Sequence, residues 1–281
     1  MPAKRASNSG EAKFLASYDA SKYPRPSVTS DIVALSIQDF ETGDFRRPTR
    51  SKICVLLIRR GGYPFKDCWA LPGGFLTPNE TIEACAAREL DEETGLRGQV
   101  LMPLRMFSKP GRDPRAWVIT QAFLAIVRKS ESKVAGGDDA REARWFEIDY
   151  SRGDNTLDFE LRSGDIRIAY SASYGRTGYG QSVLEGCAHG ARSEELAFDH
   201  AEIVAAALLR LNSADADELA FAFLPTEFTV SELQFVHEFM AGHPLLSPNF
   251  RRKASTLVEP IEGSFRGAVG HRPAAIFRRR P

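Results

Sequence analysis

The sequence predicts an α/β protein that ends in a second, smaller helical unit. Four short runs rich in β-branched and apolar residues are typical of strands, and they cover residues 31–37, 52–60, 116–127 and 143–148. Two amphipathic segments have helix-capping residues at their starts, Thr77 and Asp199. Strands interspersed with such helices indicate the α/β class.

Composition limits the possibilities without identifying a partner. The 281 residues suffice for two modest domains, and an apolar fraction of 43% predicts a substantial core. Lys plus Arg equals Asp plus Glu, so net charge indicates no partner. The four cysteines lack zinc-site spacing and are interpreted as reduced. With no apolar signal segment and no membrane-length run, we expect a cytoplasmic protein without a membrane partner.

Changes in composition along the chain suggest three parts. Residues 1–29 are polar and are expected to form an N-terminal arm, residues 30–212 the main domain, and residues 213–281 a separate domain. Within the main domain, about 151–195 is a Gly-, Ser- and Tyr-rich insertion. A turn signal at residues 163–165 predicts a β-hairpin inside it.

The helix after the glycine pair Gly73-Gly74 has clear terminal signals. We expect Thr77 to be its N-cap, Pro78 its first residue and Glu80 the partner that completes a capping box. Gly95 would end it, which gives about four and a half turns at roughly 3.6 residues per turn.

Three carboxylates on this helix, Glu89, Glu92 and Glu93, would project from one face. Such a cluster repels itself unless a hard cation binds there, and oxygen ligands favour Mg²⁺, with Mn²⁺ as the alternative. A site of this kind suits attack of water on phosphorus. Arg88 is expected to pair with a helix glutamate such as Glu80 and hold the array in register. The alternative is a solvated acidic face.

The spacing of these residues resembles the signature of the Nudix hydrolase family at every position. The matching residues are Gly74, Glu80, Arg88-Glu89-Leu90, Glu92-Glu93 and Gly95-Leu96. The resemblance covers at least residues 31–150 and implies an α/β/α sandwich around a mixed sheet. It also implies hydrolysis of a nucleoside diphosphate linked to another group.

By this resemblance, the catalytic residues are Arg88, Glu89, Glu92 and Glu93. The same three glutamates would be the metal ligands, with the Gly74 carbonyl close to the metal. The general base stays open between these glutamates and an acidic residue of the 130–142 loop, such as Asp138, Asp139 or Glu142.

A loop at residues 107–117 carries the candidate substrate-binding residues, which are Lys109, Arg112, Asp113 and Arg115. Basic groups beside a metal site suit a pyrophosphate, although an ordinary charged hairpin turn is the alternative. The loop resembles that of the ADP-ribose-binding branch of the family, which implies ADP-ribose or a related nucleotide sugar. Phe107 or Trp117 could stack on a base, or belong to the core.

The C-terminal region separates its charges. Residues 211–250 carry six acidic and no basic side chains, whereas 251–281 carry eight basic and two acidic ones. A capped helix at 226–242, a basic helix at 248–256 and a glycine-rich hairpin give the outline of a winged helix. The candidate DNA contacts are Asn249, Arg251, Arg252, Lys253 and Arg272. Alternatively, these charges solvate a surface, or the region serves docking or dimerisation.

The order of parts resembles the Nudix-related transcriptional regulators of NAD metabolism. The resemblance rests on the helix "AFDHAEI" and on the C-terminal "NFRRK" and "GHRPA" segments. It implies a homodimeric repressor that binds double-stranded DNA and senses ADP-ribose or a related nucleotide. The intact glutamate motif favours retained hydrolysis, so the two hypotheses, Nudix pyrophosphatase and DNA-binding sensor, are compatible in one bifunctional protein.

Overall fold

The computed structural model describes residues 9–44, 47–134, 140–176, 182–190, 194–213, 215–268 and 271–280. In these residues the main sheet is ten-stranded and mixed, with its path ordered β10-β9-β8-β7-β2-β1-β6-β5. Its strands are β1 (Ser27–Asp44), β2 (Arg47–Arg60), β3 (Trp69–Ala70), β4 (Gly73–Phe75), β5 (Leu101–Phe107), β6 (Val118–Val127), β7 (Ala140–Arg152), β8 (Thr156–Ser163), β9 (Ile166–Arg176) and β10 (Ser182–His189). Its helices are α2 (Ile82–Thr94) and α3 (His200–Leu211), with short 3-10 turns at Ala20–Lys22 and Lys129–Glu131.

Strand β1 is central because it pairs in parallel with β6 and antiparallel with β2 and β4. The predicted insertion extends this sheet, since β7, β8, β9 and β10 form an antiparallel series. The predicted hairpin is confirmed: Ser163 pairs with Ile166 around Gly164, whose φ of +58° favours glycine.

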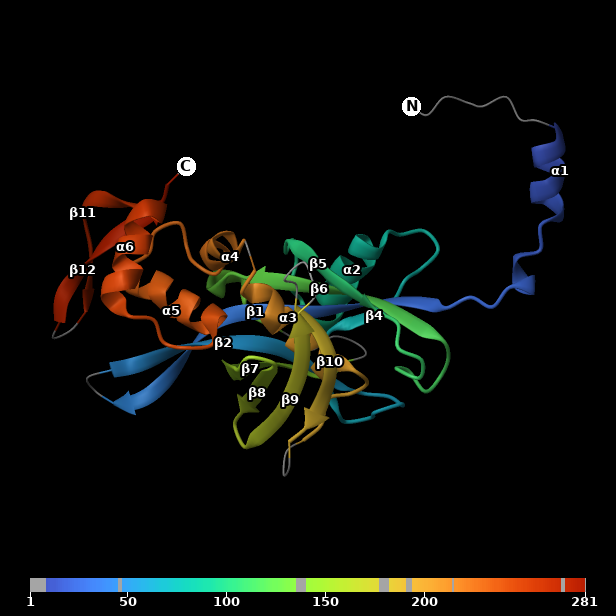
Figure 1. Ribbon diagram of the computed structural model, residues 1–281, viewed down its shortest axis with the longest axis horizontal. Coiled ribbons are helices and arrows are strands. Elements are labelled where there is room, and N and C mark those ends of the chain that lie inside the picture. Colours follow the sequence, from blue (N-terminus) through green and yellow to red (C-terminus); the bar gives the residue numbers. More distant parts are fainter. Residues whose placement is uncertain are drawn as a thin grey trace.

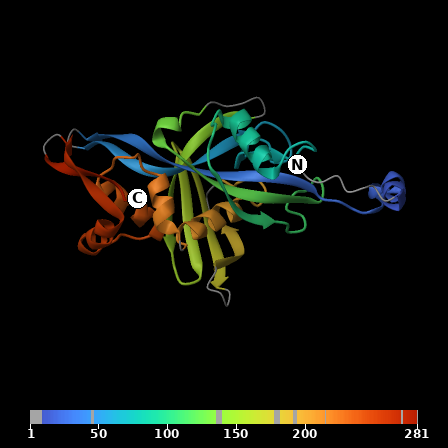
Figure 2. The same cartoon turned by 90° about the horizontal axis from the view of Figure 1, so that it is seen from above.

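Helices cover both faces of the sheet. Successive side chains of a strand point to opposite faces. Accordingly, Ile32 packs in one apolar cluster with Leu90 of α2, whereas Val33 packs in another with residues of α3 such as Leu208. Helices α2 and α3 therefore lie on opposite sides of the sheet (Figure 2). The predicted sandwich around a mixed sheet is confirmed.

The start of α2 differs from the prediction. Its N-cap is Thr81, whose hydroxyl accepts a hydrogen bond from the Ala84 N–H at 3.2 Å. The predicted N-cap, Thr77, instead donates its N–H to the Glu80 carboxylate at 2.9 Å, which closes a separate turn before the helix. The helix has 13 residues and ends as predicted at Gly95, with φ +75°.

The C-terminal elements are α4 (Ala216–Ala222), α5 (Val230–Ala241), α6 (Ser247–Leu257), β11 (Val258–Ala268) and β12 (His271–Arg279). Strands β11 and β12 pair as an antiparallel hairpin behind the basic helix α6, which is the predicted winged helix (Figure 1). The predicted capping box of α5 is confirmed, because Thr229 and Glu232 make both reciprocal hydrogen bonds.

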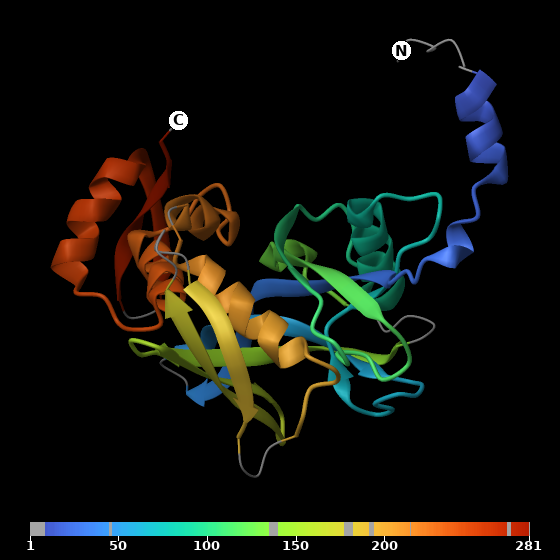
Figure 3. The same ribbon diagram turned by 45° about the vertical axis from the view of Figure 1, so that its right-hand side comes forward.

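The winged helix packs against the Nudix-like part through side-chain contacts and is not joined to it by the chain connection alone. Residues of α4, α5 and α6 share the apolar cluster of α3 and the sheet. The Tyr150 hydroxyl donates to the Met240 carbonyl at 2.7 Å, and its ring meets Phe239 edge-on at 5.3 Å. Helix α3 lies across β9 and β10 and also contacts α5 (Figure 3).

Helix α1 (Ser9–Ser17) stands apart from the rest of the molecule at the end of an extended segment (Figures 1 and 2). It exposes Phe14 and Leu15. None of the described helices combines the length and apolar character that crossing a bilayer requires.

The contact at Tyr150 generates a stability prediction. Tyr150→Phe keeps the ring against Phe239 but leaves the Met240 carbonyl without its donor, so the free energy of unfolding should fall by about 1 kcal/mol. Urea denaturation measures this, with Tyr23→Phe, at a side chain 62% exposed, as a control without effect. Equal stability of the Tyr150 variant and the wild type would contradict a stabilising contact there.

Candidate functional site

A cavity of about 800 Å³ opens where β1, the end of β2, β4, α2 and the start of α3 meet the 107–117 loop. Its wall carries carboxylates of Asp31, Glu89, Glu93 and Asp113, and guanidinium groups of Arg60, Arg88, Arg112 and Arg115. A cavity with both signs of charge suits a ligand that is itself anionic and bound with a cation.

Glu89 and Glu93 face this cavity beside the glycine pair. Glu93 accepts a hydrogen bond from the Gly73 N–H at 2.8 Å. Gly74 lies so close to Glu89 that an added Cβ would fall 2.3 Å from Glu89 Oε1, so a larger residue here would displace this carboxylate. Burial raises the pKa of Glu93 to about 8, and the nearby Glu89 charge adds to this rise. Burial likewise raises the pKa of Glu89.

Arg88 organises the glutamates, as predicted. It pairs with Glu80 at 2.8 Å, Glu89 at 2.7 Å and Glu92 at 3.0 Å, and donates to the Phe75 carbonyl at 3.2 Å. The predicted Arg88–Glu80 pair is thus confirmed. Glu92 is 59% exposed and does not line the cavity, so it is not grouped with Glu89 and Glu93 in this arrangement.

Two of the three predicted metal ligands, Glu89 and Glu93, lie together in the cavity lining. Across the part of the chain that the structure describes, no group of three or more His, Cys, Asp or Glu side chains is placed to hold a metal. Glu89 and Glu93 remain as half-buried neighbours with raised pKa values, and a cation would relieve their repulsion. Mg²⁺ commonly uses one or two carboxylates and completes its coordination with water and substrate phosphates.

Ion pairs hold the candidate substrate loop in place, both within the loop and to β1 and the start of α3. Arg112, with a side chain only 4% exposed, contacts Asp199 at 2.6 Å and Asp31 at 3.3 Å. Arg115 pairs with Asp113 at 2.7 Å, and Lys109 lies 3.6 Å from Glu202 outside the cavity lining. Arg112, Asp113 and Arg115 therefore reach the cavity, whereas Lys109 does not.

Asp199 stands at the N-cap position of α3 as predicted but does not cap the helix. Both of its carboxylate oxygens accept hydrogen bonds from Arg112 instead. A charge-assisted, two-pronged contact of this kind is stronger than a neutral cap. The start of α3 is thereby joined to the 107–117 loop.

His200 is a site residue that the sequence does not indicate. Its buried Nδ1 accepts a hydrogen bond from the Leu71 N–H at 2.9 Å, and its Nε2 lies 3.5 Å from Asp31. Burial lowers the pKa of His200, which favours the neutral ring. An isolated histidine beside a helix start carries no sequence signal for this contact.

The aromatic side chains of the cavity also differ from the expected ones. Phe107 is buried in the core and Trp117 is exposed, and neither lines the cavity. The cavity contains Phe75 and Phe198 instead. The Arg115 guanidinium lies over both rings, 5.3 Å and 5.7 Å from their centroids.

The structure leaves the general base open. Asp138 and Asp139 lie outside the described residues. The third candidate in that loop, Glu142, forms an ion pair with Arg144 and does not line the cavity.

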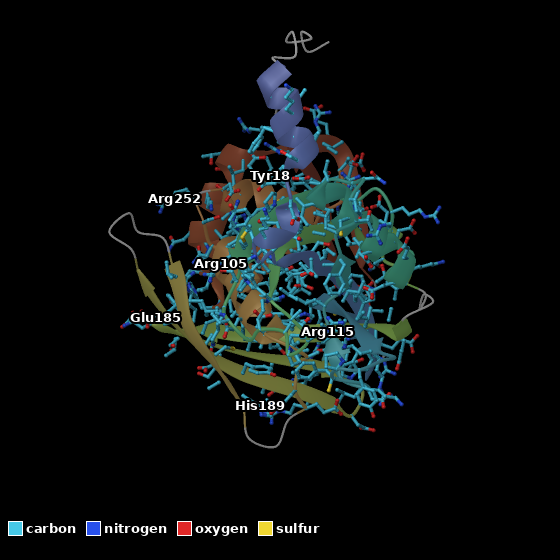
Figure 4. All side chains as sticks on the ribbon, turned by 90° about the vertical axis from the view of Figure 1, so that its right-hand side faces the viewer. Tyr18, Arg105, Arg115, Glu185, His189 and Arg252 are labelled. Atoms are coloured by element: carbon cyan, nitrogen blue, oxygen red, sulfur yellow. The ribbon has the colours of Figure 1, made fainter. Side chains whose placement is uncertain are left out.

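Helix α6 presents most of the candidate DNA contacts. Asn249, Arg251 and Arg252 are exposed, and Arg252 projects well apart from Arg115 (Figure 4). Lys253 is held by Asp217, with its Nζ 2.6 Å from the carboxylate. Arg272 lies in β12, but its side chain is outside the described part of the structure. In the described residues, Arg251 and Arg252 are thus basic side chains of α6 without an ion pair.

Family models match both parts of the chain. Residues 45–161 match the NUDIX domain, and residues 220–279 match the NrtR DNA-binding winged helix domain. Among solved structures, a MutT/nudix family protein from Enterococcus faecalis is 28% identical with a TM-score of 0.72, covering 99% of this chain and 95% of its own. Shewanella oneidensis NrtR, 24% identical with a TM-score of 0.58 over 90% of this chain and 94% of its own, has the same fold.

Two curated relatives are similar to this chain, one over almost its whole length and one over about a third of it. The ADPR responsive transcriptional repressor NtrR of Acinetobacter baylyi is 29% identical over 98% of this chain and 90% of its own length. The ADP-ribose pyrophosphatase of Methanocaldococcus jannaschii is 48% identical over 94 residues, which are 34% of this chain and 54% of that protein. The chain therefore combines a Nudix domain with an NrtR-type DNA-binding winged-helix domain.

Proposed function

We propose that this protein is a Mg²⁺-dependent Nudix pyrophosphatase that hydrolyses ADP-ribose or a related nucleotide sugar. The observation that carries the proposal is the pairing of Glu89 and Glu93 in the cavity beside the glycine pair. The 48% identity to a relative named as an ADP-ribose pyrophosphatase lies in the Nudix part of the chain and supports the substrate class.

Different residues of the cavity would have different roles in such a site. A divalent cation held by Glu89 and Glu93 would neutralise charge on a diphosphate and polarise it. Arg88 fixes Glu89 through a 2.7 Å ion pair, and the missing side chain of Gly74 leaves room for that carboxylate. Arg112 holds the substrate loop against β1 and α3, which pre-organises the wall that a ligand would meet.

A second function is supported by the C-terminal domain. We infer that the protein also binds double-stranded DNA and that a nucleotide in the Nudix cavity regulates this binding. Exposed Arg251 and Arg252 on α6 are free to contact phosphates or base edges. The Acinetobacter baylyi relative, named as an ADPR responsive repressor, matches this chain over almost its whole length. The homodimer stays a prediction.

Helix α3 offers a physical route between the two activities. Its first residue, His200, lines the cavity, and near its other end Arg210 pairs with Asp215 at 2.5 Å, just before α4. The helix also packs in the same apolar cluster as α5. A ligand that displaces the start of α3 would therefore act on the packing of the winged helix.

Glu93→Gln should lower kcat/KM for ADP-ribose on the order of 100-fold or more, because the amide cannot supply a negative ligand to the cation. Release of AMP with Mg²⁺ measures this. Glu83→Gln, at an exposed position on the same helix, should keep wild-type turnover. Full activity of the Glu93 variant would remove Glu93 from the metal site.

The raised pKa of Glu93 also predicts a pH effect on stability. A carboxyl whose pKa rises from 4.5 to about 8 on folding stabilises the folded protein most below pH 4.5, and this contribution is lost as pH rises through 8. In EDTA, the melting temperature of Glu93→Gln relative to the wild type should therefore increase by a few degrees from pH 5 to pH 9. A difference that does not change with pH would show that burial does not perturb Glu93.

Arg251→Ala with Arg252→Ala should weaken binding to DNA from the protein's own promoter region. The slope of log Kobs against log salt should become shallower by about 2, because two phosphate contacts are lost. Filter binding at several salt concentrations measures both. Arg97→Ala with Arg105→Ala removes the same charge from exposed positions of the Nudix part and should leave both values unchanged. An unaltered slope in the α6 variant would place DNA binding elsewhere.

A further inference from the structure

Arg60, at the end of β2, differs from the other arginines of the cavity. Arg88, Arg112 and Arg115 each pair with carboxylates. Arg60 is half-buried in the cavity wall, and across the described ranges it forms no ion pair. Its Nε donates to the Pro64 carbonyl at 3.0 Å, so the two terminal nitrogens remain for another partner.

No carboxylate of the described residues is in ion-pair contact with Arg60, although the charges of Glu93 and Asp113 act on it from further away. Its guanidinium lies 4.8 Å from the centroid of Phe198, and Arg115 approaches the same ring at 5.7 Å. Burial first, and then the positive charge of Arg115, lower the pKa of Arg60. Removing an unpaired charge from water is costly, and a second like charge adds to that cost. An anion bound between the two guanidinium groups would offset both effects.

The backbone at Phe198 has an unusual conformation. Phe198 has a φ of +54°, a conformation that bulky residues rarely adopt. This conformation places the Phe198 ring against Arg60, while the next two residues reach Arg112 and the Leu71 N–H. Strain of this kind gathers at binding sites, where the surrounding structure maintains it.

We infer that Arg60, stacked on Phe198, binds a phosphate group of the nucleotide ligand directly. The inference deepens the proposed function and rests on it for the identity of the ligand. The diphosphate would then contact two kinds of group. The Glu89–Glu93 pair can bind it only through a cation, whereas Arg60 can bind it directly. Gly61 and Gly62 follow Arg60 in the cavity lining, and an added Cβ on Gly62 would meet nothing within 4 Å, so this side is open to a ligand.

Calorimetric titration of the full-length protein tests the inference. Arg60→Ala should weaken ADP-ribose binding roughly 10- to 100-fold, as expected for the loss of hydrogen bonds from a charged donor. Adenosine, which has no phosphate, should bind equally to variant and wild type. Arg60→Gln, which keeps much of the aliphatic stem, should show the same selective loss, and circular dichroism would establish that both variants fold.

Arg59→Ala is the matched control. Arg59 is the preceding residue of β2, its side chain is exposed, and it lies outside the cavity lining. The Arg59→Ala variant should bind ADP-ribose and adenosine with the affinities of the wild type. If the Arg60 variants bind ADP-ribose as tightly as the wild type, or lose adenosine to the same extent, the inference is wrong while the proposed function can still stand.

Inorganic pyrophosphate without Mg²⁺ separates the two ideas. A wild type that neither binds nor hydrolyses ADP-ribose would refute the proposed function. In that case, weaker pyrophosphate binding in Arg60→Gln, but not in Arg59→Ala, would still support Arg60 as a phosphate ligand. Equal pyrophosphate binding in all three proteins would overturn it.

Discussion

The site depends on one buried ionic contact, in which Arg112 lies between Asp31 and Asp199. Their side chains are 4%, 10% and 9% exposed, respectively. Removing one partner from such a group is strongly destabilising, because it leaves a buried charge uncompensated. The contact joins β1, the 107–117 loop and the start of α3. All three elements contribute residues to the cavity lining.

The same contact explains why charge in the cavity is divided unequally. Asp31 and Asp199 balance Arg112, and Asp113 balances Arg115, so these charges organise the wall. Arg88 in turn pairs with Glu80, Glu89 and Glu92. Glu93, whose pKa burial raises to about 8, and Arg60, which forms no ion pair across the described ranges, are left as the cavity groups that a cation and an anion would contact. A diphosphate with a divalent cation supplies both kinds of partner.

Local signals in the sequence predict the parts of this fold that depend on neighbouring residues. The glutamate helix, its glycine stop, the Gly164 hairpin and the Thr229 capping box all use residues a few positions apart. The predicted start of α2 was wrong because Glu80 closes a turn with Thr77, and the helix begins only after Thr81. Contacts between distant residues left no such pattern: Arg112 and Asp199 are 87 positions apart. For that reason the sequence does not indicate that Arg112 pairs with Asp199, or that His200 and Phe198 line the cavity.

The position of α3 gives a physical reason for the two proposed activities to share one chain. Its first residue, His200, lines the cavity, and the strained Phe198 stands two residues before it. Its far end is tied to the segment before α4 through Arg210 and Asp215. A rigid helix moves as a unit, so a small displacement at the cavity would be transmitted to the apolar cluster that α3 shares with α5. Hydrolysis would remove the ligand that causes this displacement, so an active Nudix site would limit how long the nucleotide signal lasts.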